Sequence, residues 1–127
     1  MIGLLVVSHS EQAAAGIREI ALEMGGEDAS IVAVGGDVDG GIGTSVTDIQ
    51  AALEDLLEDA DGVVILADLG SAVMNAEYAI EALEQEERVV VAEDAPVLEG
   101  ALNAAVAAAS PSASLDSVRQ AALEAGN

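Results

Sequence analysis

Short, uninterrupted apolar runs rich in valine and isoleucine constrain the fold of this chain more than any other feature. They cover residues 2–7 and 63–67 without a break, and two segments that each begin with a polar residue, 30–34 and 88–92, are interpreted as further short strands. A strand with apolar residues at every position, rather than at alternate positions, is covered on both faces, as in a parallel sheet. The runs therefore predict four short strands in a sheet buried on both sides.

Patterns of helical spacing separate these runs. They predict five helices. The first covers 10–24, the second begins at about Val46 and ends at Asp61-Gly62, and the fourth and fifth cover 97–109 and the residues from Ser114 onward. The third is predicted from the apolar stripe of Ala72, Ala76, Ile80 and Leu83. Strands that alternate with helices predict a three-layer α/β fold, in which a four-stranded parallel sheet with right-handed crossovers has helices on both faces. The length fits a single domain over residues 1–127.

Two details of the helices follow from local patterns. The first helix is expected to open with a capping box, because Ser8-His9-Ser10-Glu11 matches S-x-x-E. Its buried face is expected to consist of Ala13, Ile17, Ile20, Ala21 and Met24. The alanine-rich segment 97–109 fits close packing of a helix on the sheet, and it is also a candidate subunit interface.

The composition excludes several classes of function. The chain has 24 acidic residues against three arginines, a net charge of −21, and neither lysine nor cysteine. P-loop and Schiff-base enzymes need a lysine, nucleic-acid surfaces need clustered cations, and disulfides and cysteine nucleophiles need cysteine. The N-terminus lacks the features of a signal peptide, and no apolar run approaches the ~20 residues of a membrane span. We therefore expect a cytoplasmic protein without nucleic-acid or membrane partners.

Three unusual segments follow the predicted strands. They are His9, the glycine-dense loop 35–45 and Asp68-Leu69-Gly70-Ser71. Ligands of open parallel sheets bind at the carboxyl ends of the strands, so these segments mark the candidate site. Within the loop, Thr44 and Ser45 precede a helix, which predicts hydroxyls and backbone N–H groups at the rim of the site. If the first and third strands are neighbours, His9 and Asp68 come within reach of each other.

His9 is the only histidine, and it lies at a strand-to-helix turn where the first N–H groups of a helix favour an anion. A neutral imidazole accepts a phosphoryl group well when a carboxylate such as Asp68 holds its other nitrogen protonated. Three alternatives stay open here. His9 is a loop residue without a role, or a metal ligand, although no H-x-x-x-H spacing is present. The third alternative is that it pairs with a serine nucleophile at Ser8, Ser10, Ser45 or Ser71, although no G-x-S-x-G elbow is present.

Four segments together resemble a known family. They are residues 5–10, 36–45, 68–77 and 94–101, and they follow one another in the order of that family over nearly the whole chain. The family is DhaM, the phosphotransferase subunits of phosphoenolpyruvate-dependent dihydroxyacetone kinases. It is itself similar to the mannose-type IIA components of the sugar phosphotransferase system.

The resemblance implies a role for each matching residue. His9 matches the phosphorylated histidine, which takes its phosphoryl group from phospho-HPr and passes it to ADP on the kinase subunit DhaL, the partner of DhaK. Asp68 matches the carboxylate that hydrogen-bonds the imidazole. If Asp68 fixes the tautomer through Nδ1–H, we expect Nε2 to receive the phosphoryl group. Thr44 and Ser45 match the loop that faces it. Ser10, Gly70 and Ser71 complete the expected phosphoryl and partner site.

The resemblance also implies a sheet of order 2-1-3-4, a homodimer, and a covalent phosphohistidine that needs no metal or nucleotide cofactor in this chain. Some members of the family carry HPr-like and enzyme I-like domains after this one. Since the sequence ends at Asn127, the donor is expected to be a separate protein. Gly41 stands where many relatives carry a larger polar or basic residue. Two alternative functions are a mannose-type IIA component of sugar transport and a non-catalytic regulator that reports its phosphorylation state.

The acidic residues are spread over nearly every predicted helix, which favours a general adaptation to a salt-rich cytosol over a single basic partner. The Debye length falls from ~30 Å at 0.01 M to ~3 Å at 1 M ionic strength, so salt screens the self-repulsion of the folded chain. We expect the free energy of unfolding, measured by urea titration, to rise between dilute buffer and molar KCl. A free energy that stays constant or falls would contradict the adaptation to salt.

Overall fold

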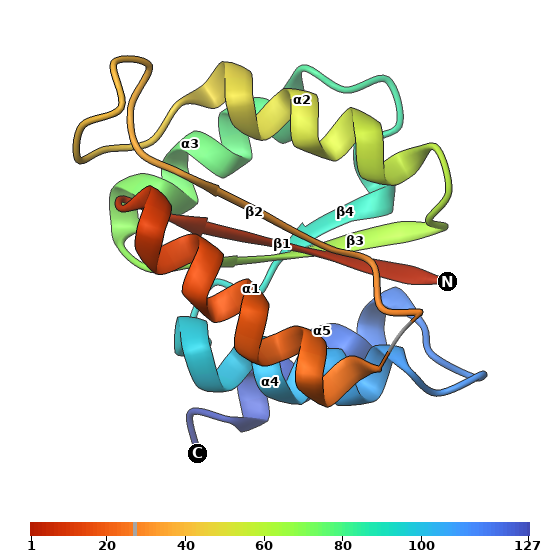
Figure 1. The fold of residues 1–127 in the computed structure, drawn as a ribbon. Coiled ribbons are helices and arrows are strands. Elements are labelled where there is room, and N and C mark those ends of the chain that lie inside the picture. The colour runs from red at the N-terminus through yellow and green to blue at the C-terminus, as the bar shows by residue number, and fades with distance from the viewer. Residues whose placement is uncertain (27) are drawn as a thin grey trace.

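The computed structural model describes residues 1–26 and 28–127. The strands are β1 (Ile2–Ser8), β2 (Ile31–Gly35), β3 (Gly62–Ala67) and β4 (Val89–Val91), and the helices are α1 (Glu11–Gly25), α2 (Val46–Leu57), α3 (Gly70–Glu81), α4 (Val97–Ala108) and α5 (Leu115–Glu124), with a short 3-10 turn at Glu86–Arg88. The strands form a parallel sheet of order β2-β1-β3-β4. Helices α1, α4 and α5 cover one face and α2 and α3 the other (Figure 1). The predicted α/β architecture and strand order are confirmed.

Every residue of the two central strands is buried, which explains their uninterrupted apolar sequences. Alternate side chains enter different cores. Leu4 and Val64 pack in the core shared with α1, α4 and α5, whereas Leu5 and Ile65 pack in the core shared with α2 and α3. Each apolar position of β1 and β3 therefore contributes to one of two helix–sheet interfaces.

The face that α1 buries differs from the expected one. Ala14 and Ala21 are buried, but Ile20 is 46% exposed and Met24 51% exposed. Helix α1 packs against α4 as well as the sheet, and α4 presents small residues such as Ala105 to the same core. Small side chains let these elements approach closely, so Ile20 and Met24 lie outside the contact, whereas the expected Ile17 is partly buried and packs against this core.

The capping box expected at Ser8 is also wrong. Strand β1 continues through Ser8, which pairs with Gly35 of β2. The N-cap of α1 is Ser10, whose Oγ accepts a hydrogen bond from the backbone N–H of Ala13 at 3.2 Å. Because the strand runs one residue further than the pattern implied, the Ser8 side chain is available for another contact.

Two of the three arginines bind backbone carbonyls at the amino ends of the strands. Arg18 Nε donates to the carbonyl oxygen of Ile31 at 2.6 Å, where β2 begins. Arg88 donates through Nε to Asp61 at 3.0 Å and through Nη2 to Leu57 at 3.1 Å, next to the start of β3. Arg119, on α5, lines a cavity beside the edge strand β4.

None of the helices in residues 1–26 and 28–127 has both the length and the apolar character that crossing a bilayer requires.

Gly35 is required where β2 ends against the start of α1. A Cβ at this position would lie 2.5 Å from the carbonyl oxygen of Ser10, whereas one at Gly16, inside α1, would meet nothing within 4 Å. We expect Gly35→Ala to lower the free energy of unfolding by about 1–3 kcal/mol, because the backbone of α1 must move. Gly16→Ala, the matched control, should raise it by up to ~1 kcal/mol, since alanine favours helix. Urea denaturation of both variants measures the difference, and equal effects would contradict the close contact at Gly35.

Candidate functional site

The pairing of β1 with β3 brings His9 and Asp68 together at the carboxyl edge of the sheet. Val7 is in register with Ala67, and the backbone N–H of Asp68 donates to the carbonyl of Val7 at 3.2 Å. His9, which follows β1, therefore lies beside Asp68, which follows β3. His9 Nδ1 is 2.9 Å from Asp68 Oδ1, so the expected proximity of the two side chains is confirmed.

Three donors hold the carboxylate of Asp68. The His9 ring faces Oδ1, while Oδ2 accepts hydrogen bonds from the Ser8 hydroxyl at 2.8 Å and from the backbone N–H of His9 at 3.0 Å. Partial burial by itself would raise the pKa of Asp68, but the hydrogen bonds from the His9 ring, the Ser8 hydroxyl and the His9 N–H together lower it below the usual 3.8. Asp68 is therefore ionised at neutral pH.

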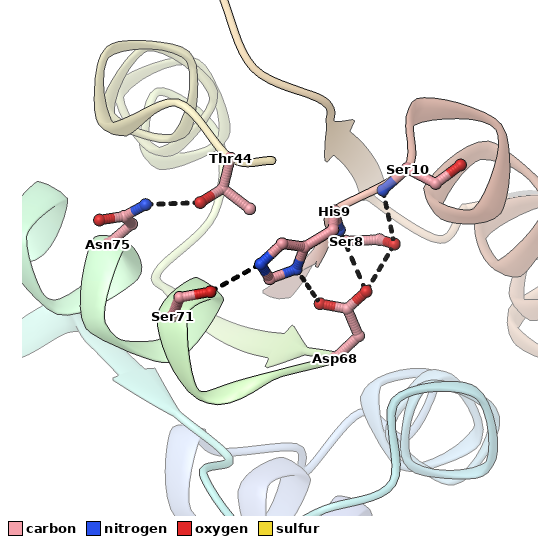
Figure 2. A network of polar contacts seen from close by, with 7 residues as sticks. All are labelled: Ser8, His9, Ser10, Thr44, Asp68, Ser71 and Asn75. Atoms are coloured by element: carbon pink, nitrogen blue, oxygen red, sulfur yellow. Dashed lines mark hydrogen bonds and ion pairs between the residues drawn. The ribbon is translucent and has the colours of Figure 1, made fainter. Parts of the chain in front are cut away.

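An ionised Asp68 fixes the tautomer of a neutral His9. A carboxylate only accepts hydrogen bonds, so Nδ1 carries the proton and Nε2 the lone pair. The Ser71 hydroxyl lies 2.6 Å from Nε2 and donates to it. Figure 2 shows the imidazole between Asp68 on one side and Ser71 on the other. The side chains of His9 and Asp68 are 19% and 21% exposed, so the pair is partly shielded from solvent.

Helix α3 begins next to Nε2 with its first N–H groups available. It has no side-chain N-cap and no acidic residue in its first turn. By contrast, the Ser10 and Ser45 hydroxyls cap α1 and α2, and each of these helices carries an acidic residue in its first turn. A Cβ added at Gly70 would meet nothing within 4 Å, so no other part of the chain packs against this end of α3 at that position. Unpaired N–H groups at a helix start form an anion site.

The other predicted site residues lie at different places. Thr44 faces the space beside the imidazole, and its Oγ1 accepts a hydrogen bond from Asn75 Nδ2 (Figure 2). Ser45 is 4% exposed and its Oγ accepts from the N–H of Asp48, so the expectation that its hydroxyl lies open at the rim is wrong. Ser10 Oγ is the N-cap and points away from the ring.

Sequence reasoning missed the contacts of Ser8 and Asn75. Asn75 lies one helical turn after Ser71, on α3, and this i,i+4 spacing is a signal that could have identified it. Through Thr44, it joins α3 to the end of the loop that precedes α2. The backbone of the same loop is joined to the site, because Gly43 N–H donates to the carbonyl of His9 at 2.9 Å.

The loop is organised around Asp37. Its Oδ1 accepts hydrogen bonds from the N–H groups of Asp39 at 2.9 Å and Gly41 at 2.8 Å. A Cβ at Gly41 would lie 3.3 Å from Asp37 Oδ2, so a larger residue there needs Asp37 to shift. Val38 and Ile42 project outward, with 78% and 77% of their surface exposed.

No three His, Asp or Glu side chains gather closely enough to hold a metal ion within residues 1–26 and 28–127.

Comparison with known proteins gives consistent matches. Residues 3–119 match the family model described as the PTS system fructose IIA component. The chain is 37% identical over 108 residues to the phosphoryl donor subunit DhaM of PEP-dependent dihydroxyacetone kinase 2 from Listeria innocua, which covers 84% of this chain and 85% of the relative. It is 38% identical over 114 residues to the phosphoryl donor subunit DhaM from Escherichia coli, which covers 87% of this chain and 24% of the relative. The chain thus spans most of the shorter relative and about a quarter of the longer one.

Solved structures share the fold. The crystal structure of a protein of unknown function designated EF1359 matches with a TM-score of 0.84 and 34% identity, covering 99% of this chain and 95% of the other. A phosphotransferase system component EIIA from Streptococcus agalactiae matches with a TM-score of 0.70 and 19% identity, covering 98% and 92%. At that identity the second match supports the fold alone.

Asp68 makes stability depend on pH in the acid range. Its pKa is lower in the folded protein than the value of about 3.9 in an unfolded chain, so its stabilising contribution is present above that pH and is lost as pH falls through the folded pKa. We expect the free energy of unfolding of Asp68→Asn to fall less steeply than that of the wild type below about pH 4. Urea titrations across this range measure the slopes. Asp59→Asn, at an exposed position away from His9, is the control, and identical slopes for the two variants would contradict the role of Asp68.

Proposed function

This chain belongs to the fructose and mannose IIA family of phosphotransferase-system proteins and, within it, to the DhaM subunits, and we propose that it carries a phosphoryl group on Nε2 of His9. The single observation that carries the proposal is the orientation of the imidazole. Asp68 engages Nδ1 at 2.9 Å, and Nε2 points toward the open start of α3. This is the arrangement that a nitrogen nucleophile for phosphorus requires.

The transfer is a displacement between two nitrogen atoms. The Nε2 lone pair attacks the phosphorus of a donor phosphohistidine, the Nε2–P bond forms, and the P–N bond of the donor breaks. The proton on Nδ1 stays in its hydrogen bond to Asp68, so no proton has to leave the ring during attack. Catalysis is then mainly positioning and stabilisation of charge.

Neutral hydrogen-bond donors around the start of α3 bind the phosphoryl oxygens. The Ser71 hydroxyl, 2.6 Å from Nε2, occupies the direction of attack and must rotate aside. In its new position it donates to a phosphoryl oxygen, together with the backbone N–H groups of Gly70 and Ser71 and the hydroxyl proton of Thr44. Ser10 and Ser45 act as N-caps of α1 and α2, and these caps hold the loops of the site in place.

The partners and setting are part of the same proposal. The relatives are named phosphoryl donor subunits of dihydroxyacetone kinase, which supports phospho-HPr as donor and ADP on DhaL, acting with DhaK, as acceptor. The product is dihydroxyacetone phosphate. We further propose that the chain acts as a homodimer in the cytoplasm of a salt-loving host, through a covalent phosphohistidine and without a bound metal or nucleotide of its own.

We expect radiolabelled phosphoenolpyruvate, with enzyme I and HPr, to label the wild type with a bond that is stable in base and labile in acid. His9→Ala should lose the label completely. Asp68→Asn should be labelled about 10- to 100-fold more slowly, because the imidazole loses its fixed tautomer. The folded control is Gly16→Ala, which should be labelled like the wild type.

A label that persists in His9→Ala would overturn the site. Adding DhaL, DhaK, ADP and dihydroxyacetone to the same mixture then tests the acceptor. Dihydroxyacetone phosphate should accumulate with the wild type and not with His9→Ala. Labelling without accumulation would overturn the assignment of the acceptor while leaving His9 as the phosphorylated residue.

A further inference from the structure

Ser8 has a hydroxyl whose direction is fixed from both sides. The residue is 2% exposed at the end of β1. Its Oγ accepts a hydrogen bond from the backbone N–H of Ser10 at 3.1 Å and donates to Asp68 Oδ2 at 2.8 Å. The N–H of Ser10 thereby directs the proton of the hydroxyl toward Asp68. Figure 2 shows this chain of contacts on the side of Asp68 away from the ring.

The contact limits rotation of the Asp68 carboxylate. The terminal torsion of an aspartate is broad, so a carboxylate held at one oxygen turns readily. Here Oδ2 is held by Ser8 and by the N–H of His9, and Oδ1 then stays in line with Nδ1 of His9 at 2.9 Å. Since the carboxylate fixes the imidazole, Ser8 acts on the orientation of Nε2 through Asp68.

We propose that Ser8 is a positioning residue of the phosphoryl-transfer site, acting through Asp68 to hold the imidazole of His9 in one orientation with Nδ1 protonated. This inference rests on the proposed phosphorylation of His9. In this role Ser8 is neither the helix cap nor the nucleophile that the sequence pattern suggested.

The ionisation of Asp68 gives an independent measure of the contact. Burial raises the pKa of Asp68, and the hydrogen bonds from His9 and Ser8 lower it. The other charged side chains that line the cavity beside Asp68 are Glu93 and Asp94, both acidic. Neither can replace a lost donor, so the pKa of Asp68 should rise when the Ser8 hydroxyl is removed.

The experiment compares Ser8→Ala and Ser8→Thr with the wild type. The carboxyl carbon of Asp68 is titrated by NMR in the unphosphorylated protein, and labelling from phosphoenolpyruvate is followed against pH. In Ser8→Ala we expect a higher pKa of Asp68, an acid limb of the labelling rate displaced to higher pH, and a rate about tenfold lower at neutral pH, as for other groups that orient a reactive histidine. Ser8→Thr, which keeps the hydroxyl, should restore both readouts.

Two further variants exclude a merely structural effect. Ser114→Ala removes the N-cap of α5, away from the site, and should lower stability without moving either titration. Ser8→Cys is close in size to serine but donates weakly, so it should behave like Ser8→Ala even if the alanine variant fails to fold. An unchanged titration of Asp68 in Ser8→Ala or Ser8→Cys would overturn the role of Ser8. A wild type that takes no label would overturn the proposed function and this role together, whereas a labelled wild type with unchanged Ser8 variants would overturn the role of Ser8 alone.

Discussion

The parallel pairing of β1 with β3 is the constraint on which the functional edge of this protein depends. It places the end of one central strand beside the end of the other, so that His9 and Asp68 meet although 59 positions separate them. The pairing in turn depends on side chains buried in both cores, since each strand contributes alternate residues to the two helix layers. Loss of packing far from His9 would therefore loosen the contact that holds its ring.

The sequence predicted the layers and the strands because each has a local signal, whereas the His9–Asp68 contact was predicted only if the first and third strands are neighbours, an order that the family resemblance implied. Continuous apolar runs identify strands covered on both faces, and a residue after such a strand belongs to the carboxyl edge. The contact between Ser8 and Asp68 has no such signal, because a serine at the end of a strand is equally suited to cap the next helix. The buried face of α1 was predicted correctly at Ile17 and Ala21 but incorrectly at Ile20 and Met24 for a related reason. Helical spacing allows two neighbouring faces, and only the closeness of α4 selects the one with alanines.

Acidic residues are numerous in this chain but are absent from two segments at the carboxyl edge of the sheet. Residues 40–47, which lead into α2, and residues 69–76, which begin α3, contain no charged side chain. Both segments border His9, and three donors stabilise the ionised carboxylate of Asp68, its hydrogen-bond partner. In the proposed transfer the phosphoryl group brings about two negative charges, so these two uncharged segments limit repulsion beside His9.

The location of the arginines has a consequence for the energetics of transfer. Arg18 and Arg88 are bound to carbonyls at the amino ends of the strands, and Arg119 lies beside β4, so none of the three stands at the edge that carries His9. A fixed cation there would stabilise the phosphorylated state and make transfer of the phosphoryl group to an acceptor less favourable. Dipoles and hydroxyls hold the group more weakly. In the proposed phosphohistidine the group-transfer potential would therefore stay high, and the direction of transfer would depend on the relative concentrations of donor and acceptor.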